Sequence, residues 1–429
     1  MEPHDKATDL GNGDRTTWAR NYAYRADSVL EPANAAEVQQ AVKSLARVKA
    51  LGTMHSFNDI ADSAGTQISL RRFRQKTLDR NARTVTVGAG VTYGELATWL
   101  DAQGFAVHNL ASLPHISVAG ACATATHGSG IGNGNLATAA AAIEFVDGRG
   151  EIVLLSRAGN SGEFQGAVVS LGALGIVTAI TLDIIPSFEM TQTVYENLAF
   201  DELEGHLEAI LGSGYSVSLF TDWQNHRATQ VWIKEIRSAP AAPAPSFHGA
   251  TLQKTKLHPL PGHSPENCTE QEGKAGPWYD RLPHFRMNFT PSSGAELQSE
   301  YFVPRDRAYR AILAVEGLRE KITPHLFITE LRAIAADDLW MSMAYGRDSV
   351  GIHFTWKQEW NEVRPMLPRI EERLEPFEAR PHWGKLFTMP GGRLKQLYPR
   401  FADFLELANR HDPEGKFRNE FLERNLYRA

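Results

Sequence analysis

Two stretches in the second half of the chain carry charged and hydroxyl side chains at strand spacing. Residues 325–334 read HLFITELRAI, an apolar run interrupted by Glu330 and Arg332. Because side chains alternate between the two faces of a strand, Glu330 and Arg332 are expected on the same face. His353 and Thr355 lie two residues apart in a second such stretch and are also expected to share a face. Each pair taken alone fits a solvated sheet face or a structural ion pair.

A third stretch, WGKLF at 383–387, is predicted as a strand that places Lys385 among aromatic neighbours. Charged side chains embedded in apolar sequence are costly to bury unless they meet each other or a ligand. Three strands that present glutamate, arginine, histidine, threonine and lysine therefore predict one shared polar cleft. Cations, a carboxylate and an imidazole together have the chemistry to bind polar groups and to move protons.

Three glycine-rich segments in the first half, residues 52–57, 112–130 and 171–178, could hold a phosphate. Phosphates bind where several backbone N–H groups point one way, which requires close backbone approach and tolerance of positive φ. None of the three is a G-x-G-x-x-G turn that opens the helix of a βαβ unit, and no G-x-x-x-x-G-K-[ST] occurs. A Rossmann site and a P-loop are therefore not supported. Each segment alone is explained as a tight turn, but three in one half of the chain favour a binding role.

The elements expected to position these loops are short strands mixed with helices. Helices are predicted after Asn34 and Thr92, because each is an N-cap residue followed three positions later by a glutamate. An Asp147-Gly148 turn predicts a hairpin. The strands predicted in this half cover residues 48–51, 84–87, 143–146 and 152–155. This is an α+β pattern without a regular βαβ repeat.

The pattern changes near Pro186. Residues 191–389 hold longer alternating strands and a predicted helix from about 305 to 321. An irregular insertion is expected to stay out of any sheet, because proline cannot donate to a strand ladder. The prolines of this insertion are Pro240, Pro243, Pro245, Pro259, Pro261 and Pro265. The last forty residues are again predicted to be helical.

The composition is that of an ordinary globular protein with room for two or more domains: 429 residues, 42% apolar and 22% charged. A net charge of −6 and a pI near 6.2 argue against a nucleic-acid or anionic-membrane surface. No apolar run is long enough to span a bilayer or to form a signal peptide. The two cysteines, Cys122 and Cys268, form neither a disulfide framework nor a zinc site. We therefore expect a cytoplasmic monomer that binds no metal, nucleic acid or membrane.

Longer motifs follow one another in a recognisable order. They are GTMHSFN (52–58), NLASLPHISVAGACATATHGSG (109–130), SLGALGIVT (170–178), FTDW (220–223), PHFRMNFTPSSGAELQSEY (283–301), RPHWGK (380–385) and DPEGKFRNEF (412–421). In this order they resemble the vanillyl-alcohol oxidase family of FAD-linked oxidases, and more closely the bacterial alditol oxidases, from about Trp18 to Phe421. The resemblance implies an α+β, two-domain FAD-binding fold with an antiparallel-sheet cap domain. Its parts would be a tail (1–17), an FAD-binding domain (18–190), the cap (191–389) and a C-terminal segment (390–429) that completes the FAD-binding domain.

The resemblance also implies a cofactor, FAD, attached through its 8α-methyl carbon to a ring nitrogen of His55. A loop histidine taken alone is usually solvated or hydrogen-bonded, but a neutral imidazole is nucleophilic at ordinary pH. His127, in a glycine-rich turn, is the alternative histidine, one that contacts the cofactor without bonding to it. The other cofactor-binding residues implied are Ala50, Leu51, Gly52, Thr53, Met54, Ser56, Ser112, Ser117, Gly120, Thr124, Ala125, Thr126, His127, Ile176 and Val177.

The same resemblance places substrate-binding residues in the predicted cleft: Ser112, Glu330, Arg332, His353, Thr355 and Lys385. The implied reaction oxidises the terminal hydroxyl of an alditol such as xylitol or sorbitol to the aldose and reduces oxygen to hydrogen peroxide. A polyol needs several fixed donors and acceptors, because each unmatched hydroxyl loses its hydrogen bonds to water. Arg332 and Lys385 would stabilise a developing alkoxide, with Glu330 orienting them, and Lys385 and His353 are both candidates for the base.

Two other functions compete with this interpretation. One is an aldonolactone oxidase or dehydrogenase of the same superfamily, which acts on a sugar lactone. The other is a flavin carrier or sensor without catalysis, which would leave the polar cleft without a task. The small side chain of Ala111, next to Ser112, leaves room for oxygen and favours an oxidase.

Overall fold

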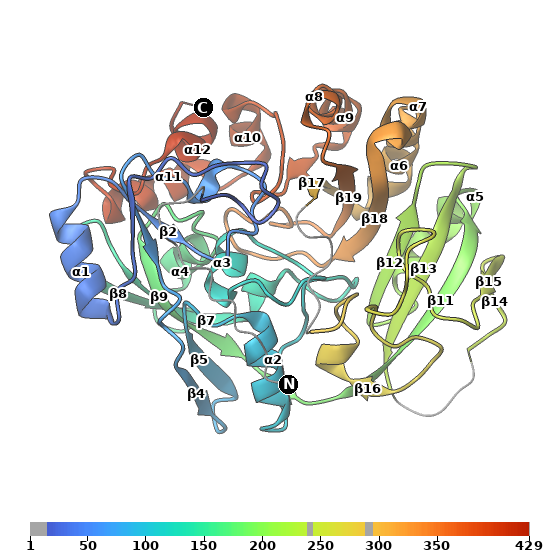
Figure 1. Cartoon of the computed structure of the whole chain (residues 1–429), viewed down its shortest axis with the longest axis horizontal. Coiled ribbons are helices and arrows are strands. Elements are labelled where there is room, and N and C mark those ends of the chain that lie inside the picture. Colours follow the sequence, from blue (N-terminus) through green and yellow to red (C-terminus); the bar gives the residue numbers. More distant parts are fainter. Residues whose placement is uncertain (1–14, 238–242, 288–294, 429) are drawn as a thin grey trace.

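The computed structural model describes residues 15–237, 243–287 and 295–428, which fold into two parts (Figure 1). The first part contains two small sheets. One is parallel, with the strand order β1 (Ser28–Leu30), β3 (Thr66–Ser69), β2 (Val48–Leu51). The other is antiparallel, with the order β4 (Lys76–Asp79), β5 (Thr84–Gly88), β9 (Ile176–Asp183), β7 (Ala140–Val146), β8 (Ile152–Ser156). A two-stranded pair, β6 (Phe105–Ala106) and β10 (Ile185–Pro186), completes this part. The four strands predicted in this half are confirmed.

Both predicted helix starts are also confirmed. Helix α1 (Ala35–Ser44) begins after Asn34, whose side chain accepts a hydrogen bond from the N–H of Glu37. Helix α2 (Tyr93–Asp101) begins with the full capping box of Thr92 and Glu95. These bonds satisfy N–H groups that lack a partner in the first turn of a helix. The remaining helices of this half are α3 (Val118–Ala123) and α4 (Ser161–Val168).

The second part is dominated by one large antiparallel sheet. Its order is β14 (Ser246–Phe247), β15 (Ala250–Leu252), β11 (Glu189–Ala199), β13 (Arg227–Ile236), β12 (Ser216–Thr221), β18 (Leu326–Ile334), β19 (Ser349–Lys357), β17 (Glu296–Pro304), β20 (Arg380–Pro381), with β16 (Gly276–Pro277) also paired to β11. Helices α5 (Asp201–Leu211), α6 (Ala308–Glu316) and α9 (Met366–Leu374) pack on one face and bury an apolar core. The opposite face of the central strands carries polar side chains beside a smaller apolar cluster that includes Phe220, Trp232 and Ile328.

The single helix predicted over 305–321 is interrupted. A turn of 3-10 helix (Arg305–Arg307) leads into α6, which ends at Gly317, and a short helix α7 (Arg319–Ile322) follows. Glycine is a poor helix former, so it ends the helix where the apolar periodicity alone would have continued it.

The insertion does join the sheet, contrary to the prediction. The hairpin β14–β15 forms between Pro245 and Pro259 and pairs with β11 at the sheet edge. The proline-free stretch from 246 to 258 keeps its backbone donors, and those donors permit the pairing. Pro240 lies outside the described residues.

The C-terminal segment is helical, as predicted, and returns to the first part (Figure 1). It contains α10 (Gly391–Leu397), α11 (Phe401–His411), α12 (Glu420–Leu422) and a π-helical turn (Glu423–Tyr427). The side-chain amide of Asn419 donates to the main-chain oxygens of Asp59, Ile60 and Asp62, at 2.9–3.1 Å. This contact joins the end of the chain to the segment that follows the His55 loop.

The domain boundaries drawn from the sequence stay predictions. Residues 15–17 were assigned to the tail, but Thr16 forms a bridge with Ala23 and Thr17 is only 1% exposed. Helices α8 (Trp360–Val363) and α9 fall within the residues assigned to the cap, close in sequence to its predicted boundary at 389. Within the described ranges, no helix has the length and apolarity needed to cross a membrane.

Candidate active site

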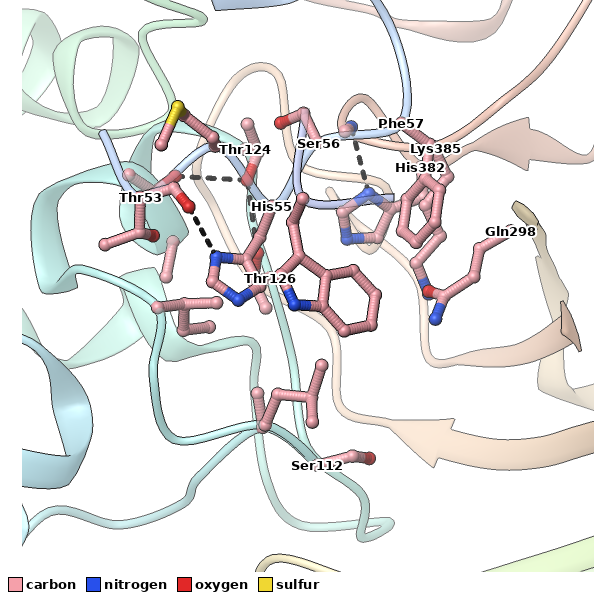
Figure 2. Close-up of a pocket in the computed structure, with 18 of the residues that line it drawn as sticks. Thr53, His55, Ser56, Phe57, Ser112, Thr124, Thr126, Gln298, His382 and Lys385 are labelled. Atoms are coloured by element: carbon pink, nitrogen blue, oxygen red, sulfur yellow. Dashed lines mark hydrogen bonds between the residues drawn. The ribbon is translucent and has the colours of Figure 1, made fainter. Parts of the chain in front are cut away.

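A cavity of about 680 Å³ lies between the two parts and is lined from both. Figure 2 shows part of it, with Thr53 and His55 on one side and Gln298, His382 and Lys385 on the other. From the first part it is lined by Ala50, Leu51, Gly52, Thr53, Met54, His55, Ser56, Ser112, Ser117, Gly120, Thr124, Thr126, His127 and Val177. From the second part it is lined by Glu330, Arg332, His353, Thr355 and Lys385. Ala125 and Ile176, also predicted for the site, are instead fully buried in the core.

The polar side chains of the second part lie in rows across three adjacent strands. Glu330 of β18 is in register with His353 of β19, and His353 is in register with Glu300 of β17. Residues directly opposite each other on antiparallel strands project from the same face. In the next row, Thr355 lies opposite Gln298. The predicted alternation along β18 and β19 therefore does gather these side chains on one face.

Arg332 reaches sideways across the sheet because its neighbour in the ladder is Gly351. A Cβ at Gly351 would lie 3.0 Å from Oε1 of Glu300. Arg332 donates from Nη2 to Oε1 of Glu300 at 3.3 Å and from Nη1 to Oγ of Ser112 at 3.2 Å. Its Nε lies 3.6 Å from Oε1 of Glu330 and, among the described residues, has no acceptor within hydrogen-bond distance. This buried donor is therefore available to a ligand oxygen.

Lys385 is not on a strand, and the prediction of a third strand over 383–387 is wrong. Strand β20 ends at Pro381, and the N–H of Lys385 instead closes a turn onto the main-chain oxygen of His382 at 3.0 Å. The side-chain amide of Asn58 donates to the main-chain oxygens of Trp383 and Lys385, both at 2.8 Å. These carbonyls bond to an amide of the first part and not to a neighbouring strand.

The ammonium group of Lys385 nevertheless reaches the predicted polar cleft. It donates to Oε2 of Glu300 at 2.5 Å and to Nδ1 of His353 at 2.7 Å. Because Nδ1 accepts, the proton of the neutral imidazole is on Nε2, which donates to Oγ1 of Thr355 at 3.0 Å. Glu300, Lys385, His353 and Thr355 thus form a continuous hydrogen-bonded chain.

Burial and neighbouring charges set the protonation states in this cluster. Burial, with Lys385 beside it, lowers the pKa of His353 to about 4, so the imidazole is neutral at pH 7. Burial also lowers the pKa of Lys385. Burial alone would raise the pKa of Glu330, but Arg332 and His284 hold it well below its usual value. Glu330 is therefore ionised.

A buried chain behind Glu330 was not predicted from the sequence. Nε2 of His284 donates to Oε1 of Glu330 at 2.8 Å, and Nζ of Lys234 donates to Nδ1 of His284 at 3.2 Å. Lys234 also donates to the main-chain oxygens of Leu282 and Pro283, and burial lowers its pKa to about 7. These bonds fix the carboxylate of Glu330. Lys234 lies on β13 and comes close to Glu330 of β18 because both strands pair with β12. This pairing cannot be read from any local pattern in the sequence.

Glu300 was missed as well, although a signal for it existed. Gln298 and Glu300 lie two residues apart in ELQSEYF, the same spacing that identified Glu330 and Arg332. On β17, Gln298 lines the cavity, and Glu300 lies next to it with a fully buried side chain. The strand alternation rule would have found this pair.

His55 lies on the loop that follows β2. Its Nδ1 donates to the main-chain oxygen of Thr53 at 2.7 Å, and the ring stacks on Trp18 with centroids 5.5 Å apart. Its Nε2 is buried and has no hydrogen-bond partner within the described residues. Burial lowers the pKa of His55 to about 4, so the ring is neutral. A neutral imidazole with one unpaired buried nitrogen fits the residue expected to bind the flavin.

The three glycine-rich loops meet at the wall of the cavity. Each contains a non-glycine residue in the left-handed region: Met54 (φ 59°), Ala125 (φ 52°) and Leu171 (φ 53°). Such strain is characteristic of ligand-binding loops. A Cβ at Gly120 would lie 2.8 Å from Oγ of Ser117, which accepts the hydrogen bond of the Gly120 N–H at the start of α3. Loops of this kind could hold a pyrophosphate.

Lys49, which the sequence did not single out, ties these loops together. Its buried ammonium donates to the main-chain oxygens of Leu171 and Gly172 and, at 3.3 Å, to that of Phe417 in the C-terminal segment. Burial lowers the pKa of Lys49 to about 7. One side chain thus links β2, the third loop and the chain end.

His127 differs in surroundings from His55. Its Nε2 lies 3.1 Å from Oε1 of Glu300, and its ring packs edge-on against Phe302. It lines the cavity but belongs to the ionic cluster. The geometry thus separates the two candidate histidines.

A flavin-cradling first part and a cap sheet that close over one cavity define an FAD-dependent oxidoreductase. Residues 26–156 match the model of the FAD binding domain family, and residues 294–425 match that of D-arabinono-1,4-lactone oxidase. The chain is 47% identical to an alditol oxidase from Streptomyces sp., over 95% of this chain and 97% of that protein. It belongs to the alditol oxidase family.

More distant proteins are similar to this chain over almost its whole length. The chain is 26% identical to the L-gulonolactone oxidase of Mus musculus, over 96% of this chain and 97% of that protein. It is 27% identical to the L-gulono-1,4-lactone dehydrogenase of Mycobacterium tuberculosis, over 96% of this chain and 98% of that protein. The crystal structure of cholesterol oxidase from B. sterolicum superposes with a TM-score of 0.76, over 99% of this chain and all of that one, at 13% identity. The predicted two-domain FAD-binding fold with an antiparallel cap is confirmed.

Proposed function

We propose that this enzyme oxidises a terminal hydroxyl of an alditol to the aldose and reduces oxygen to hydrogen peroxide. The observation that carries the proposal is the set formed by the buried Glu330, Arg332 and His353 and the partly buried Lys385 in the same cavity as His55. Membership of the alditol oxidase family supports the same substrate class.

The charges of the site suit an uncharged, hydroxyl-rich substrate. Two cations, Arg332 and Lys385, are matched by two carboxylates, Glu300 and Glu330, so these four groups together carry no net formal charge. Lys234, a further buried cation, lies behind His284 and does not line the cavity. An anionic or cationic substrate would leave one buried charge unmatched, at a cost of several kcal/mol by order of magnitude. A polyol adds no charge and supplies a donor and acceptors at each carbon, which fixed partners such as Ser112 can match.

The residues of the cap divide the work of the reaction. When bound, FAD supplies the acceptor for the hydride that leaves the carbinol carbon, and its reoxidation by oxygen yields hydrogen peroxide. Nε of Arg332 and the ammonium of Lys385 hold the reacting oxygen and stabilise negative charge that develops on it. The hydroxyl proton passes to the Lys385–His353 pair, whose nitrogens lie 2.7 Å apart. Glu330, held by His284, orients Arg332 and accepts a hydrogen bond from a substrate hydroxyl.

We also propose that a ring nitrogen of His55 carries the covalent link to the flavin 8α-methyl carbon. The neutral ring and its unpaired buried nitrogen support this assignment. The resulting electron-withdrawing substituent should raise the flavin potential, which favours hydride removal from an unactivated alcohol.

An aldonolactone oxidase is the second candidate, favoured by the family match over residues 294–425. The identity of 47% to an alditol oxidase against 26–27% to the gulonolactone enzymes places it second. A lactone also lacks the linear run of hydroxyls that the polar rows of the cap would match.

Anaerobic mixing tests the proposal. Xylitol and sorbitol should bleach the flavin absorbance, and admission of oxygen should then release one hydrogen peroxide per polyol oxidised. L-Gulono-1,4-lactone should react much more slowly. Bleaching by the lactone alone would establish the second candidate, and no bleaching by any polyol would disprove the proposal. Flavin fluorescence that stays with the denatured wild-type chain, and is lost in His55→Ala, tests the covalent link separately.

A further inference from the structure

We infer that Glu300 is the positioning residue that holds the Lys385 ammonium in place and keeps it protonated. The inference rests on the proposed function, because it concerns how that site handles the hydroxyl proton. Glu300 does not belong to the set of residues predicted to touch the substrate. Its role is argued from its location and its partners.

Glu300 is a fully buried carboxylate at the centre of the ionic cluster, with 0% of its side chain exposed. Its Oε2 accepts from Lys385 at 2.5 Å and lies 3.6 Å from Nδ1 of His353. Its Oε1 accepts from Arg332 at 3.3 Å and lies 3.1 Å from Nε2 of His127. Four separate elements therefore meet at one carboxylate, which is a costly arrangement to bury unless every partner is in place.

Lys385 depends on this carboxylate more than a residue on a strand would. Lys385 itself lies in a turn outside the strand ladder, although the N–H groups of His382 and Leu386 on either side donate to main-chain oxygens of β17. Among the described residues the Lys385 ammonium has two hydrogen-bond partners, Glu300 and His353, and the second is a neutral ring. Without Glu300 the ammonium would be hydrogen-bonded by one neutral group, and only the weaker influence of Glu330 would offset the Arg332 cation.

The charges around Lys385 give the expected direction of the effect. The groups that face its ammonium are Glu300 of β17, Glu330 and Arg332 of β18, His353 of β19 and His382 of its own turn, with His127 behind Glu300. Burial and Arg332 lower the pKa of Lys385, and Glu300 is the strongest influence that opposes them. Removal of the Glu300 charge should therefore release the proton from Lys385 at a lower pH.

The pH profile of anaerobic flavin reduction by xylitol tests this in Glu300→Gln and Glu300→Asp holoenzymes. In Glu300→Gln, the limb that belongs to Lys385 should move to lower pH by about 1–3 units, the usual effect of a close opposite charge. The limb moves downward whether Lys385 reacts as the free base or as the ammonium, so the sign of the shift does not depend on that choice. The maximal rate should fall about tenfold or more. Glu300→Asp keeps the charge but moves the carboxylate about one methylene farther from the Lys385 ammonium. It should shift the Lys385 limb of the pH profile in the same direction by a smaller amount.

Glu371→Gln is the matched control. Glu371 is a partly buried carboxylate, less buried than Glu300, which accepts hydrogen bonds from Tyr301 and Thr388 and does not line the cavity. Its loss should lower the melting temperature and leave the pH profile unchanged. A readout without turnover is thermal unfolding: the stability deficit of Glu300→Gln should narrow as pH rises from 7 to 10, because the unpaired Lys385 then sheds its proton in the folded state.

Each outcome decides a different question. Variants that fold and keep the wild-type pH profile would overturn the inference and leave Glu300 a structural residue. If Glu300→Gln does not fold, the Glu300→Asp shift decides. A wild-type enzyme that no polyol reduces would instead reject the proposed function, before any variant is compared.

Discussion

Arg332 and Lys385 reach the same place by different routes. Arg332 projects from a central strand over the gap left by Gly351, whereas Lys385 projects from a turn. Arg332 also has the buried unpaired donor Nε. In the proposed reaction both cations would stabilise negative charge on the reacting oxygen, and preorganised donors of this kind provide a large share of catalysis in many enzymes.

We expect Arg332→Ala and Lys385→Ala each to slow flavin reduction by xylitol by roughly 10²–10³-fold, the usual cost of removing one such donor. FAD should stay bound, because neither side chain belongs to the cradle loops. Stopped-flow absorbance measures the rate, and the flavin-to-protein ratio reports retention. Lys357→Ala on β19, whose ammonium bonds to the main-chain oxygen of Pro324, is the control and should react at the wild-type rate. Wild-type rates in both cavity variants would show that the reacting oxygen binds elsewhere.

At the scale of elements, the two parts are joined at the site by hydrogen bonds between loops. The side chain of Asn58, three residues after His55, holds the Lys385 turn through two carbonyls. The N–H of Phe57 donates to the main-chain oxygen of Gly384 at 2.8 Å. These hydrogen bonds thus fix the position of the Lys385 turn relative to the loop that is expected to carry the flavin.

Asn58→Ala should therefore reduce turnover by about tenfold without removing any group from the cavity. Two buried carbonyls lose their donor, at a cost of about 1–3 kcal/mol each, and the Lys385 turn gains freedom. The loss should appear in kcat more than in KM, because the other substrate contacts remain, and calorimetry should show a lower melting temperature. Asn160→Ala is a suitable comparison, since Asn160 is exposed and makes no capping bond. Unchanged kcat with a lowered melting temperature would mean that Lys385 is placed by Glu300 alone.

The predictions of helices and strands were correct where the signal lies within a few residues and wrong where the structure depends on contacts between distant segments. Capping boxes and strand alternation are encoded within a few residues, so α1, α2, β18 and β19 were found. WGKLF alternates like a strand, but two of its carbonyls accept hydrogen bonds from Asn58, which is more than 300 residues away in the sequence. That contact could not be predicted from the local pattern. The Lys234–His284–Glu330 chain likewise depends on the register between strands. A single sequence carries no local record of such pairings.

Across the whole molecule, most of the histidines with lowered pKa values gather around the cavity. Burial lowers the pKa of His55, of His353 and of the partly buried His258 to about 4, and it also lowers those of His127, His284 and His382. In the unfolded chain each of these rings would take up a proton near pH 6.5. The folded protein therefore binds fewer protons than the unfolded chain between about pH 6.5 and pH 4, and its stability must fall as the pH falls through that range.

Four groups act in the opposite direction but do not balance the histidines. Glu316 and Asp201 raise the pKa of His226, and burial raises the pKa of Asp337 to about 6 and also raises those of Glu371 and Asp412, so these groups favour the folded state as the solution becomes acidic. Each cavity histidine with a lowered pKa, by contrast, costs up to about 1.4 kcal/mol per pH unit below 6.5. We expect the melting temperature to decrease steadily from pH 7 to pH 5 in a series of scanning calorimetry runs. The slope should become shallower in His353→Gln, which removes one of the rings, and stay unchanged in a variant of the exposed His206. A melting temperature that is flat over this range would mean that the imidazoles of the cavity take up protons as readily in the folded protein as in the unfolded chain. The charge balance that makes the site suitable for a neutral polyol would then be lost below about pH 6.5.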